Sequence, residues 1–135
     1  MVEQPQALLP ATALLLIAHG SRQEEANADL FYFAQELQRL GRYGIVEASF
    51  LEIAAPDILE GGARCVARGA TQVILLPCFF SAGVHLRRDL TSACCELSAR
   101  FLQVRFELAE PLGRNPLLTE ILAARAREAE ERLRG

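Results

Sequence analysis

Short apolar segments alternate with longer, helix-like segments along almost the whole chain, and this alternation constrains the fold more than any other feature. Strand-like apolar runs recur at 13–18, 45–51, 73–77 and 102–108. Between the first two runs, Leu30, Ala34 and Leu37 follow helical spacing. Continuous apolar strands separated by helices are typical of a parallel sheet covered on both faces and joined by right-handed crossovers. The chain therefore predicts a flavodoxin-like, three-layer αβα fold with a four-stranded parallel sheet.

Turn-forming residues predict where the helices begin and end. Gly41 follows the first helical pattern as a stop signal, and the segment 55–57 opens a second helix, with Pro56 at an early position, that runs towards 68–69. A third helix is expected from about residue 85 to 99. Asn115 is the expected cap of a fourth helix with Pro116 in its first turn. The alternating Glu and Arg residues at the end of this helix predict a solvated, ion-paired face.

Length and composition indicate one globular domain over residues 1–135, whose first residues, 1–11, form a loose N-terminal segment. The chain has 135 residues, of which 51% are hydrophobic and 23% charged, which is enough apolar material for a core. The formal net charge of -3 does not favour binding to nucleic acid or to an anionic membrane. All basic residues are arginine; compositional bias explains most of them, although guanidinium groups also suit carboxylates and phosphates.

The cysteines and the N-terminal segment both indicate a cytoplasmic protein. Cys65, Cys78, Cys94 and Cys95 form neither a zinc-ribbon pattern nor a secreted disulfide framework, so we expect buried, reduced thiols. The first 16 residues contain no Arg or Lys, unlike a signal peptide, and the apolar run is too short to span a bilayer. We interpret this run as a buried strand.

The two histidines of the chain fall at the ends of strands that we expect to be neighbours. In the strand order 2-1-3-4, strands 1 and 3 lie side by side at the switch point where open α/β sheets bind ligands. His19 follows strand 1, His85 lies a few residues past strand 3, and Glu52 ends strand 2. Imidazoles with a carboxylate form a plausible site for a divalent transition metal, or Glu52 can act as a general base. Taken singly, each is equally a surface or capping residue.

Small and basic residues flank the histidines. Gly20 and Gly83 permit close approach of a ligand or positive φ, although ordinary turns explain them equally well. Ser21 and Arg22 stand near a helix N-terminus, where anions bind readily. The basic residues 87 and 88 in the first turn of the third helix oppose its dipole, so a ligand carboxylate would account for one of them. A solvated helix face is the alternative.

The motifs together resemble those of a known family. The stretches "LLIAHGSR" (15–22), "ASFLEIAAPDI" (48–58), "VILLPCFFSAGVHLRRDL" (73–90) and "EPLGRNPLL" (110–118) are similar to those of the short, single-domain sirohydrochlorin chelatases of the CbiX/SirB type, within the class II chelatases. They occur in the family's order and cover nearly all of the chain after Ala13. One departure is Thr91, which stands where the family often has a proline soon after the Asp of the third motif.

The resemblance implies a chelatase-like α/β fold and a lyase that inserts a divalent metal into sirohydrochlorin, the tetrapyrrole precursor of sirohaem and cobalamin. It implies that His19 and His85 bind the metal and that Glu52 lies in the active-site cleft. The metal is then a substrate rather than a resident cofactor, with Fe²⁺ favoured, Co²⁺ next and Ni²⁺ as a further candidate. Longer relatives contain two such domains around one cleft, which implies that a short chain forms a homodimer.

A polycarboxylate substrate needs a basic rim on this acidic protein. Arg22, Arg87, Arg88 and Arg114 are the candidate clamps, together with Ser21 and Gly83 as further substrate-binding residues. Two other functions stay open from the sequence. One is a histidine-dependent phosphoryl-transfer enzyme, although Ala18 stands where those sites usually place an arginine. The other is a metal-binding chaperone that uses the same histidines without catalysis.

Overall fold

The structure, a computed structural model, describes residues 11–135. Apart from Ala11, the expected loose segment at 1–11 lies outside the described residues. Strands and helices alternate throughout, as predicted, in the order β1 (Thr12–Ala18), α1 (Glu24–Arg39), β2 (Ile45–Phe50), α2 (Ile58–Ala67), β3 (Gln72–Pro77), α3 (Val84–Arg100), β4 (Arg105–Leu108) and α4 (Pro116–Arg134).

The four strands form one parallel sheet in the order β2-β1-β3-β4, which confirms the predicted topology. In this order β1 is central, and its Leu15 lies opposite Glu47 of β2 and Leu75 of β3. Strand β2 is added on one side of β1, whereas β3 and β4 are added on its other side. The carboxyl ends of β1 and β3 therefore form the switch point of the sheet.

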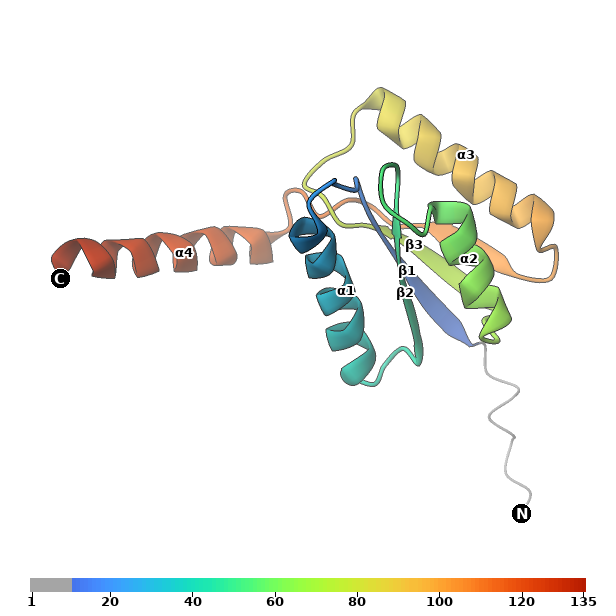
Figure 1. Cartoon of the computed structure of the whole chain (residues 1–135), viewed down its shortest axis with the longest axis horizontal. Coiled ribbons are helices and arrows are strands. Elements are labelled where there is room, and N and C mark those ends of the chain that lie inside the picture. The colour runs from blue at the N-terminus through green and yellow to red at the C-terminus, as the bar shows by residue number, and fades with distance from the viewer. Residues whose placement is uncertain (1–10) are drawn as a thin grey trace, which may run out of the picture.

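Side chains of β1 alternate between two hydrophobic cores on opposite faces of the sheet. Leu15 and Ile17 pack with α2 and α3 on one face, and Leu14 and Leu16 pack with α1 on the other. Figure 1 shows α1 on one side of the sheet and α2 and α3 on the other. Burial on both faces explains why β1 is a continuous apolar run in the sequence.

Capping residues determine where the helices begin. The Asp57 side chain accepts a hydrogen bond from the Glu60 amide at 2.8 Å, and the Glu60 side chain accepts one from the Asp57 amide at 3.1 Å. Pro56 therefore lies just before the Asp57 cap and not inside α2. The prediction that Pro56 occupies an early helical position was wrong. The cap of α4 is confirmed, because Asn115 Oδ1 accepts a hydrogen bond from the Leu117 amide at 2.9 Å.

Strand β4 is shorter than predicted. Residues 102–104 form a turn, in which the Val104 amide donates to the Phe101 carbonyl at 2.9 Å, and only Arg105–Leu108 pair with β3. The apolar character of the segment 102–108 could not separate the turn from the strand. Leu102 is 85% exposed, which shows that this residue is not part of the sheet core.

Helix α4 leaves the body of the domain (Figure 1) and has no buried residue. Its ion pairs, such as Arg125–Glu128 at 2.9 Å and Arg134–Glu131 at 3.3 Å, confirm the predicted solvated face. On the face of the sheet that α1 covers, α1 packs against β1 and β2. Helices therefore cover both faces of the sheet, as predicted for a three-layer αβα fold, with α1 on one face and α2 and α3 on the other.

Within residues 11–135, no helix combines the length and apolar character that crossing a membrane requires.

Candidate active site

His19 is held at the carboxyl end of a rigid strand. Residues 13–17 of β1 are buried, and His19 emerges one residue after the strand as an exposed side chain. Its imidazole ring lies over the Phe79 ring, with centroids 4.8 Å apart and a tilt of 34°. This contact restrains the imidazole from the β3 side, so a buried strand and an aromatic ring together orient one candidate metal ligand.

Glu52 reaches the same edge of the sheet, as predicted from its position after β2. The Leu51 amide donates to the Ala18 carbonyl at 2.9 Å, and the Glu52 amide donates to the His19 carbonyl at 3.1 Å. The backbone pairing of β1 and β2 thus continues past both strands. The Glu52 side chain is exposed.

Gly20 is required for this close pairing. It has a φ of 96°, and a Cβ built there would collide with the Glu52 carbonyl oxygen. Positive φ combined with a backbone neighbour leaves no room for a side chain. Ile53, the residue after Glu52, also has positive φ, at 71°, which is unusual for a β-branched residue. The loop therefore turns sharply immediately after Glu52.

A local hydrogen-bond network shapes the segment that leads from His19 into α1. The Ser21 amide donates to Asn27 Oδ1 at 2.9 Å, and Asn27 Nδ2 donates to the Ser21 carbonyl at 2.8 Å. The Ser21 hydroxyl accepts a hydrogen bond from the Gln23 amide at 3.0 Å. Arg22 is exposed beside this turn. Asn27 was not anticipated from the sequence, because a lone Asn within a helical segment carries no distinctive pattern.

His85 is the second residue of α3 and is exposed at the same end of the sheet as His19. Strand β3 continues towards it, since the Cys78 amide donates to the Ile17 carbonyl at 2.7 Å. Gly83 precedes α3 with a φ of −72°, and a Cβ there would meet nothing within 4 Å. Neither positive φ nor a close backbone contact requires glycine at this position, in contrast to Gly20.

The candidate arginines lie in the loop after β1, in the first turns of α3 and in the loop before α4. Arg87 and Arg88 are exposed in the first turns of α3, and Arg87 is 3.5 Å from Glu110. Arg114 lies in the loop before α4, with a φ of 64°. This loop is tied to the β3–α3 loop by a hydrogen bond from the Leu112 amide to the Phe79 carbonyl at 3.0 Å.

Exposed apolar side chains accompany the histidines, and no sequence pattern predicted them. Ile53, Phe80 and Val84 are 62%, 65% and 72% exposed. All three belong to the loops or helix turn that follow the strand ends. In the sequence they look like continuations of buried segments, and only the loop conformations turn them to solvent. The site thus combines imidazoles, guanidinium groups and apolar surface.

Residues 11–135 contain no group of three or more His, Cys, Asp and Glu side chains arranged to hold a metal ion. His19, His85 and Glu52 therefore do not converge as three ligands within the described chain, although Glu52 and His19 are joined through their backbones.

Two cysteine thiols are hard to ionise in the folded protein. Burial raises the pKa of the Cys78 thiol, and burial raises the pKa of Cys65 to about 12. All four cysteines are free, but Cys65 alone among them is buried and Cys95 is exposed, so the expectation of buried thiols was wrong for the others.

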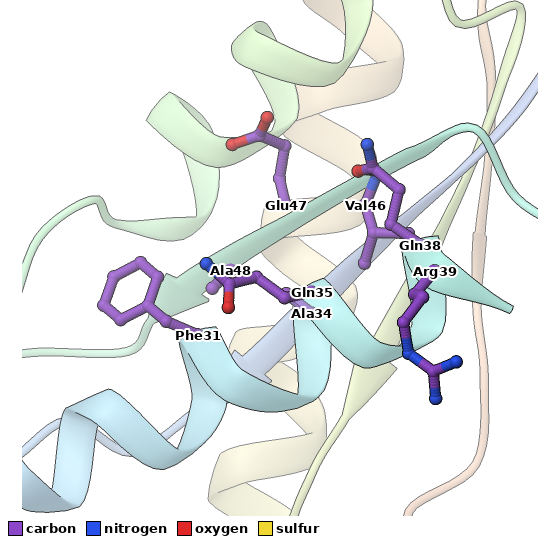
Figure 2. A pocket seen from close by; sticks show the side chains of 8 residues that line it. All are labelled: Phe31, Ala34, Gln35, Gln38, Arg39, Val46, Glu47 and Ala48. Atoms are coloured by element: carbon purple, nitrogen blue, oxygen red, sulfur yellow. Dashed lines mark hydrogen bonds between the residues drawn. The ribbon is translucent and has the colours of Figure 1, made fainter.

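A separate hollow of about 430 Å³ lies between α1 and the edge strand β2 (Figure 2), and neither histidine lines it. Several of its polar groups already have partners. Gln38 Oε1 accepts from the Val46 amide at 3.3 Å, and Glu47 pairs with Arg68 at 2.7 Å. This hollow therefore belongs to the packing of α1 on the sheet.

The structure is that of an open α/β protein with a parallel sheet, whose two histidines follow the adjacent strands β1 and β3. The family model described as CbiX matches residues 13–129. The chain belongs to the CbiX family.

Relatives and solved structures agree with this assignment. The chain is 34% identical to a sirohydrochlorin cobaltochelatase of Sulfolobus acidocaldarius, over 86% of this chain and 90% of that protein. It is 36% identical to a sirohydrochlorin cobaltochelatase of Priestia megaterium over 89% of this chain, but spans 39% of that longer protein.

Two crystal structures resemble the fold. A putative cobalamin biosynthesis CbiX protein from Marinobacter aquaeolei has a TM-score of 0.78 at 28% identity, covering 90% of this chain and 98% of that chain. The sirohydrochlorin chelatase SirB of Bacillus subtilis subspecies spizizenii, in complex with cobalt, has a TM-score of 0.79 at 25% identity, covering 87% of this chain and 50% of that one.

Proposed function

We propose that the protein is a sirohydrochlorin chelatase, a lyase that inserts a divalent metal ion into the tetrapyrrole. The observation that carries this proposal is the position of the two histidines, His19 after β1 and His85 at the start of α3, at one edge of adjacent strands. Relatives named sirohydrochlorin cobaltochelatase and ferrochelatase support it. The comparisons give no support to a phosphoryl-transfer reaction.

The histidines bind the incoming metal as neutral imidazoles. With at most two ligands from one chain, the metal keeps open positions that pyrrole nitrogens fill as they replace water. Each metal ion that enters displaces the pyrrole N–H protons, and a base must accept them. Glu52 and the histidines stand where they can take these protons or pass them to water. In this proposal Glu52 is one of the groups that can accept these protons, beside His19 and His85.

The surrounding surface suits a macrocycle with apolar faces and charged edges. Ile53, Phe80 and Val84 offer apolar contact area, and Arg22, Arg87, Arg88 and Arg114 offer charge-assisted hydrogen bonds to carboxylates. Ser21 and Gly83 lie on the same loops. Binding at the periphery can hold the ring bent, with strain of roughly 1–5 kcal/mol, so that its nitrogen lone pairs turn towards the metal.

We favour Fe²⁺ as the physiological metal, for sirohaem, with Co²⁺ next, for cobalamin. Curated relatives of both kinds match the chain, and imidazole ligands suit either metal. We further propose a cytoplasmic homodimer. Four free thiols fit a reducing compartment, and the longer relatives, of which this chain spans less than half, fit pairing of two copies.

Anaerobic metal insertion followed by absorbance spectroscopy tests the reaction, with Fe²⁺, Co²⁺ and Ni²⁺ compared in parallel. We expect His19→Ala and His85→Ala each to lower the insertion rate on the order of a hundredfold or more, with unchanged circular dichroism. Arg100→Ala, at the far end of α3 and paired with Glu96, is a control that should insert metal normally. Full activity of either folded histidine variant would contradict the role of that residue.

The same assay separates an enzyme from a metal chaperone. A chaperone would bind the metal without increasing the rate at which sirohydrochlorin takes it up. An enzyme raises that rate catalytically, with many turnovers per protein chain. Wild-type protein that binds Co²⁺ yet leaves the uncatalysed rate unchanged would overturn the proposed activity.

A further inference from the structure

The His19 imidazole is oriented differently from most metal-binding histidines. A histidine ligand normally donates its second ring N–H to a carboxylate, a carbonyl or a water molecule, and this hydrogen bond fixes the plane of the ring. Among residues 11–135, no side chain or backbone group forms a hydrogen bond with either ring nitrogen of His19. If the protein itself orients this ring, another kind of contact must do so.

The Phe79 ring supplies that contact. Its centroid is 4.8 Å from that of the His19 ring, and the two planes are tilted by 34°, which lies in the range where aromatic pairs attract one another. The His19 side chain is exposed, so without this neighbour it could rotate among the usual staggered conformations. The Phe79 ring on one side of the imidazole removes part of that freedom.

The Phe79 side chain is itself held by the hydrophobic core. It is half-buried and packs against the core on the α2–α3 face of the sheet, whose buried members include Ile17 and Leu90. The adjacent Phe80, by contrast, is 65% exposed. Of these two neighbouring aromatic rings, Phe79 is therefore the one that offers a fixed surface to the imidazole.

The backbone around Phe79 is held from two sides as well. The Cys78 amide donates to the Ile17 carbonyl at 2.7 Å, and the Phe79 carbonyl accepts a hydrogen bond from the Leu112 amide at 3.0 Å. These bonds join the segment to β1 and to the loop before α4. Figure 1 shows the segments that follow β1, β3 and β4 gathered at one end of the sheet. The position of the Phe79 ring is thus determined by three parts of the fold.

The second histidine has no comparable restraint. His85 is exposed in the first turn of α3. In the part of the chain that the structure describes, none of the aromatic pairs includes His85. The contact with Phe79 therefore distinguishes His19 from His85, and an effect of Phe79 on metal binding should pass through His19 alone.

We propose that Phe79 is a positioning residue, which holds the His19 imidazole in the orientation that binds the incoming metal ion. The inference rests on the proposed function, because that function assigns metal binding to His19. Fixing a free side chain on binding lowers the affinity, and a side chain that is already fixed in the unliganded protein avoids this cost. Phe79 acts through His19 in this role and touches neither the metal nor the reacting nitrogen atoms.

An aromatic positioning residue suits a metal ion that must leave the protein again. A carboxylate that accepts a hydrogen bond from a ligating imidazole strengthens the bond between metal and ligand, and it also fixes one tautomer. A phenyl ring restrains the plane of the imidazole by contact alone and accepts no proton. The metal is then presented in a defined direction without an additional negative charge to retain it, which favours its transfer to the pyrrole nitrogens.

The affinity for Co²⁺, measured without tetrapyrrole, tests the inference. Anaerobic titration of the full chain, followed by calorimetry, gives the dissociation constant. We expect Phe79→Leu to weaken Co²⁺ binding on the order of tenfold, and Phe79→Tyr, which keeps the aromatic ring, to restore most of the affinity. A Phe79→Leu protein that is folded and binds Co²⁺ like the wild type would overturn the inference.

Phe106→Leu is the matched control for this substitution. Phe106 is also half-buried against the α2–α3 core and also pairs with an aromatic ring, that of Phe101, at 6.3 Å. It lies opposite Val73, near the start of β3 and so at the other end of the sheet from the histidines. The control should lose stability in urea to a similar extent but bind Co²⁺ like the wild type. Equal losses of affinity in the two variants would assign the effect to general destabilisation and overturn the inference.

A double-mutant cycle shows whether Phe79 acts through His19. We expect Phe79→Leu to have no further effect on Co²⁺ affinity in a His19→Ala protein, because the ring that it positions is gone. In a His85→Ala protein, the same substitution should keep its full effect. A general loosening of this edge of the sheet would weaken binding in both backgrounds, and that result would overturn the inference.

Steady-state metal insertion distinguishes positioning from contact with the macrocycle. If Phe79 positions His19, Phe79→Leu raises the KM for Co²⁺ on the order of tenfold and leaves the KM for sirohydrochlorin unchanged. If Phe79 instead binds the tetrapyrrole, the KM for sirohydrochlorin rises and the affinity for Co²⁺ stays that of the wild type. The second result would overturn the inference.

Failure of the inference can be told apart from failure of the proposed function. A wild-type protein whose Co²⁺ affinity is unchanged by His19→Ala would overturn the metal-binding role of His19, and the role of Phe79 with it. A protein that loses affinity with His19→Ala but not with Phe79→Leu would overturn the inference alone. A protein that shows the expected affinities but does not accelerate metal insertion would overturn the proposed reaction and leave the positioning role of Phe79 in place.

Discussion

At the scale of single residues, Gly20 is the position where the backbone most clearly excludes a side chain. Its φ of 96° and the adjacent Glu52 carbonyl both oppose a Cβ. We expect Gly20→Ala to lower the free energy of unfolding by at least about 1–3 kcal/mol, measured by urea denaturation. Gly83→Ala is the control, with ordinary φ and no neighbour within 4 Å, and should change stability by less than about 0.5 kcal/mol. Equal effects at the two positions would contradict the steric explanation.

Some site residues could be located from the sequence, and others could not. His19, Glu52 and His85 follow predicted strands, so parallel strand direction alone brings them to one edge. The stacking of Phe79 on His19 and the exposure of Ile53 depend on loop torsions, which local sequence does not determine. For the same reason, the absence of a three-ligand cluster within residues 11–135 emerged from the structure alone.

At the scale of elements, the capping box of α2 both begins the helix and restrains the loop after β2. The Asp57–Glu60 pair begins the helix, and the Phe50 amide donates to the Pro56 carbonyl at 2.9 Å just before it. The cap therefore also fixes the loop that presents Glu52. Sequence patterns predicted the helix itself well, but placed its start too early, because Pro is favoured both within the first turn and just before a cap.

Removing this cap should destabilise the domain. We expect Asp57→Ala to lower the free energy of unfolding by about 1 kcal/mol, because the Glu60 amide loses the side-chain acceptor of its hydrogen bond at the start of α2. Asp29→Ala removes an exposed carboxylate within α1 and should be close to neutral. Chemical denaturation of both variants provides the measurement, and an Asp57→Ala protein as stable as wild type would show that the cap contributes nothing.

At the scale of the whole molecule, the topology was predictable but the coverage of the sheet was not. Continuous apolar strands such as 13–18 indicate burial on both faces, and β1 is buried as expected. The pattern cannot say which helix covers which strand. Helix α4 has the amphipathic sequence of a covering helix, and the outer strand β4 alternates exposed and partly buried residues, as expected for a strand that lacks a helix on one side.

If the chain forms the proposed homodimer, the stability of the molecule depends on protein concentration. Folding and association are then linked, so dilution favours the unfolded chain by mass action. We expect the melting temperature of the wild type to fall by roughly a few degrees for each tenfold dilution over the range in which the folded protein is mainly dimeric. Calorimetry over several dilutions, with sedimentation of the same samples, makes the measurement, and a melting temperature that stays constant while the dimer dissociates would show that association contributes no stability.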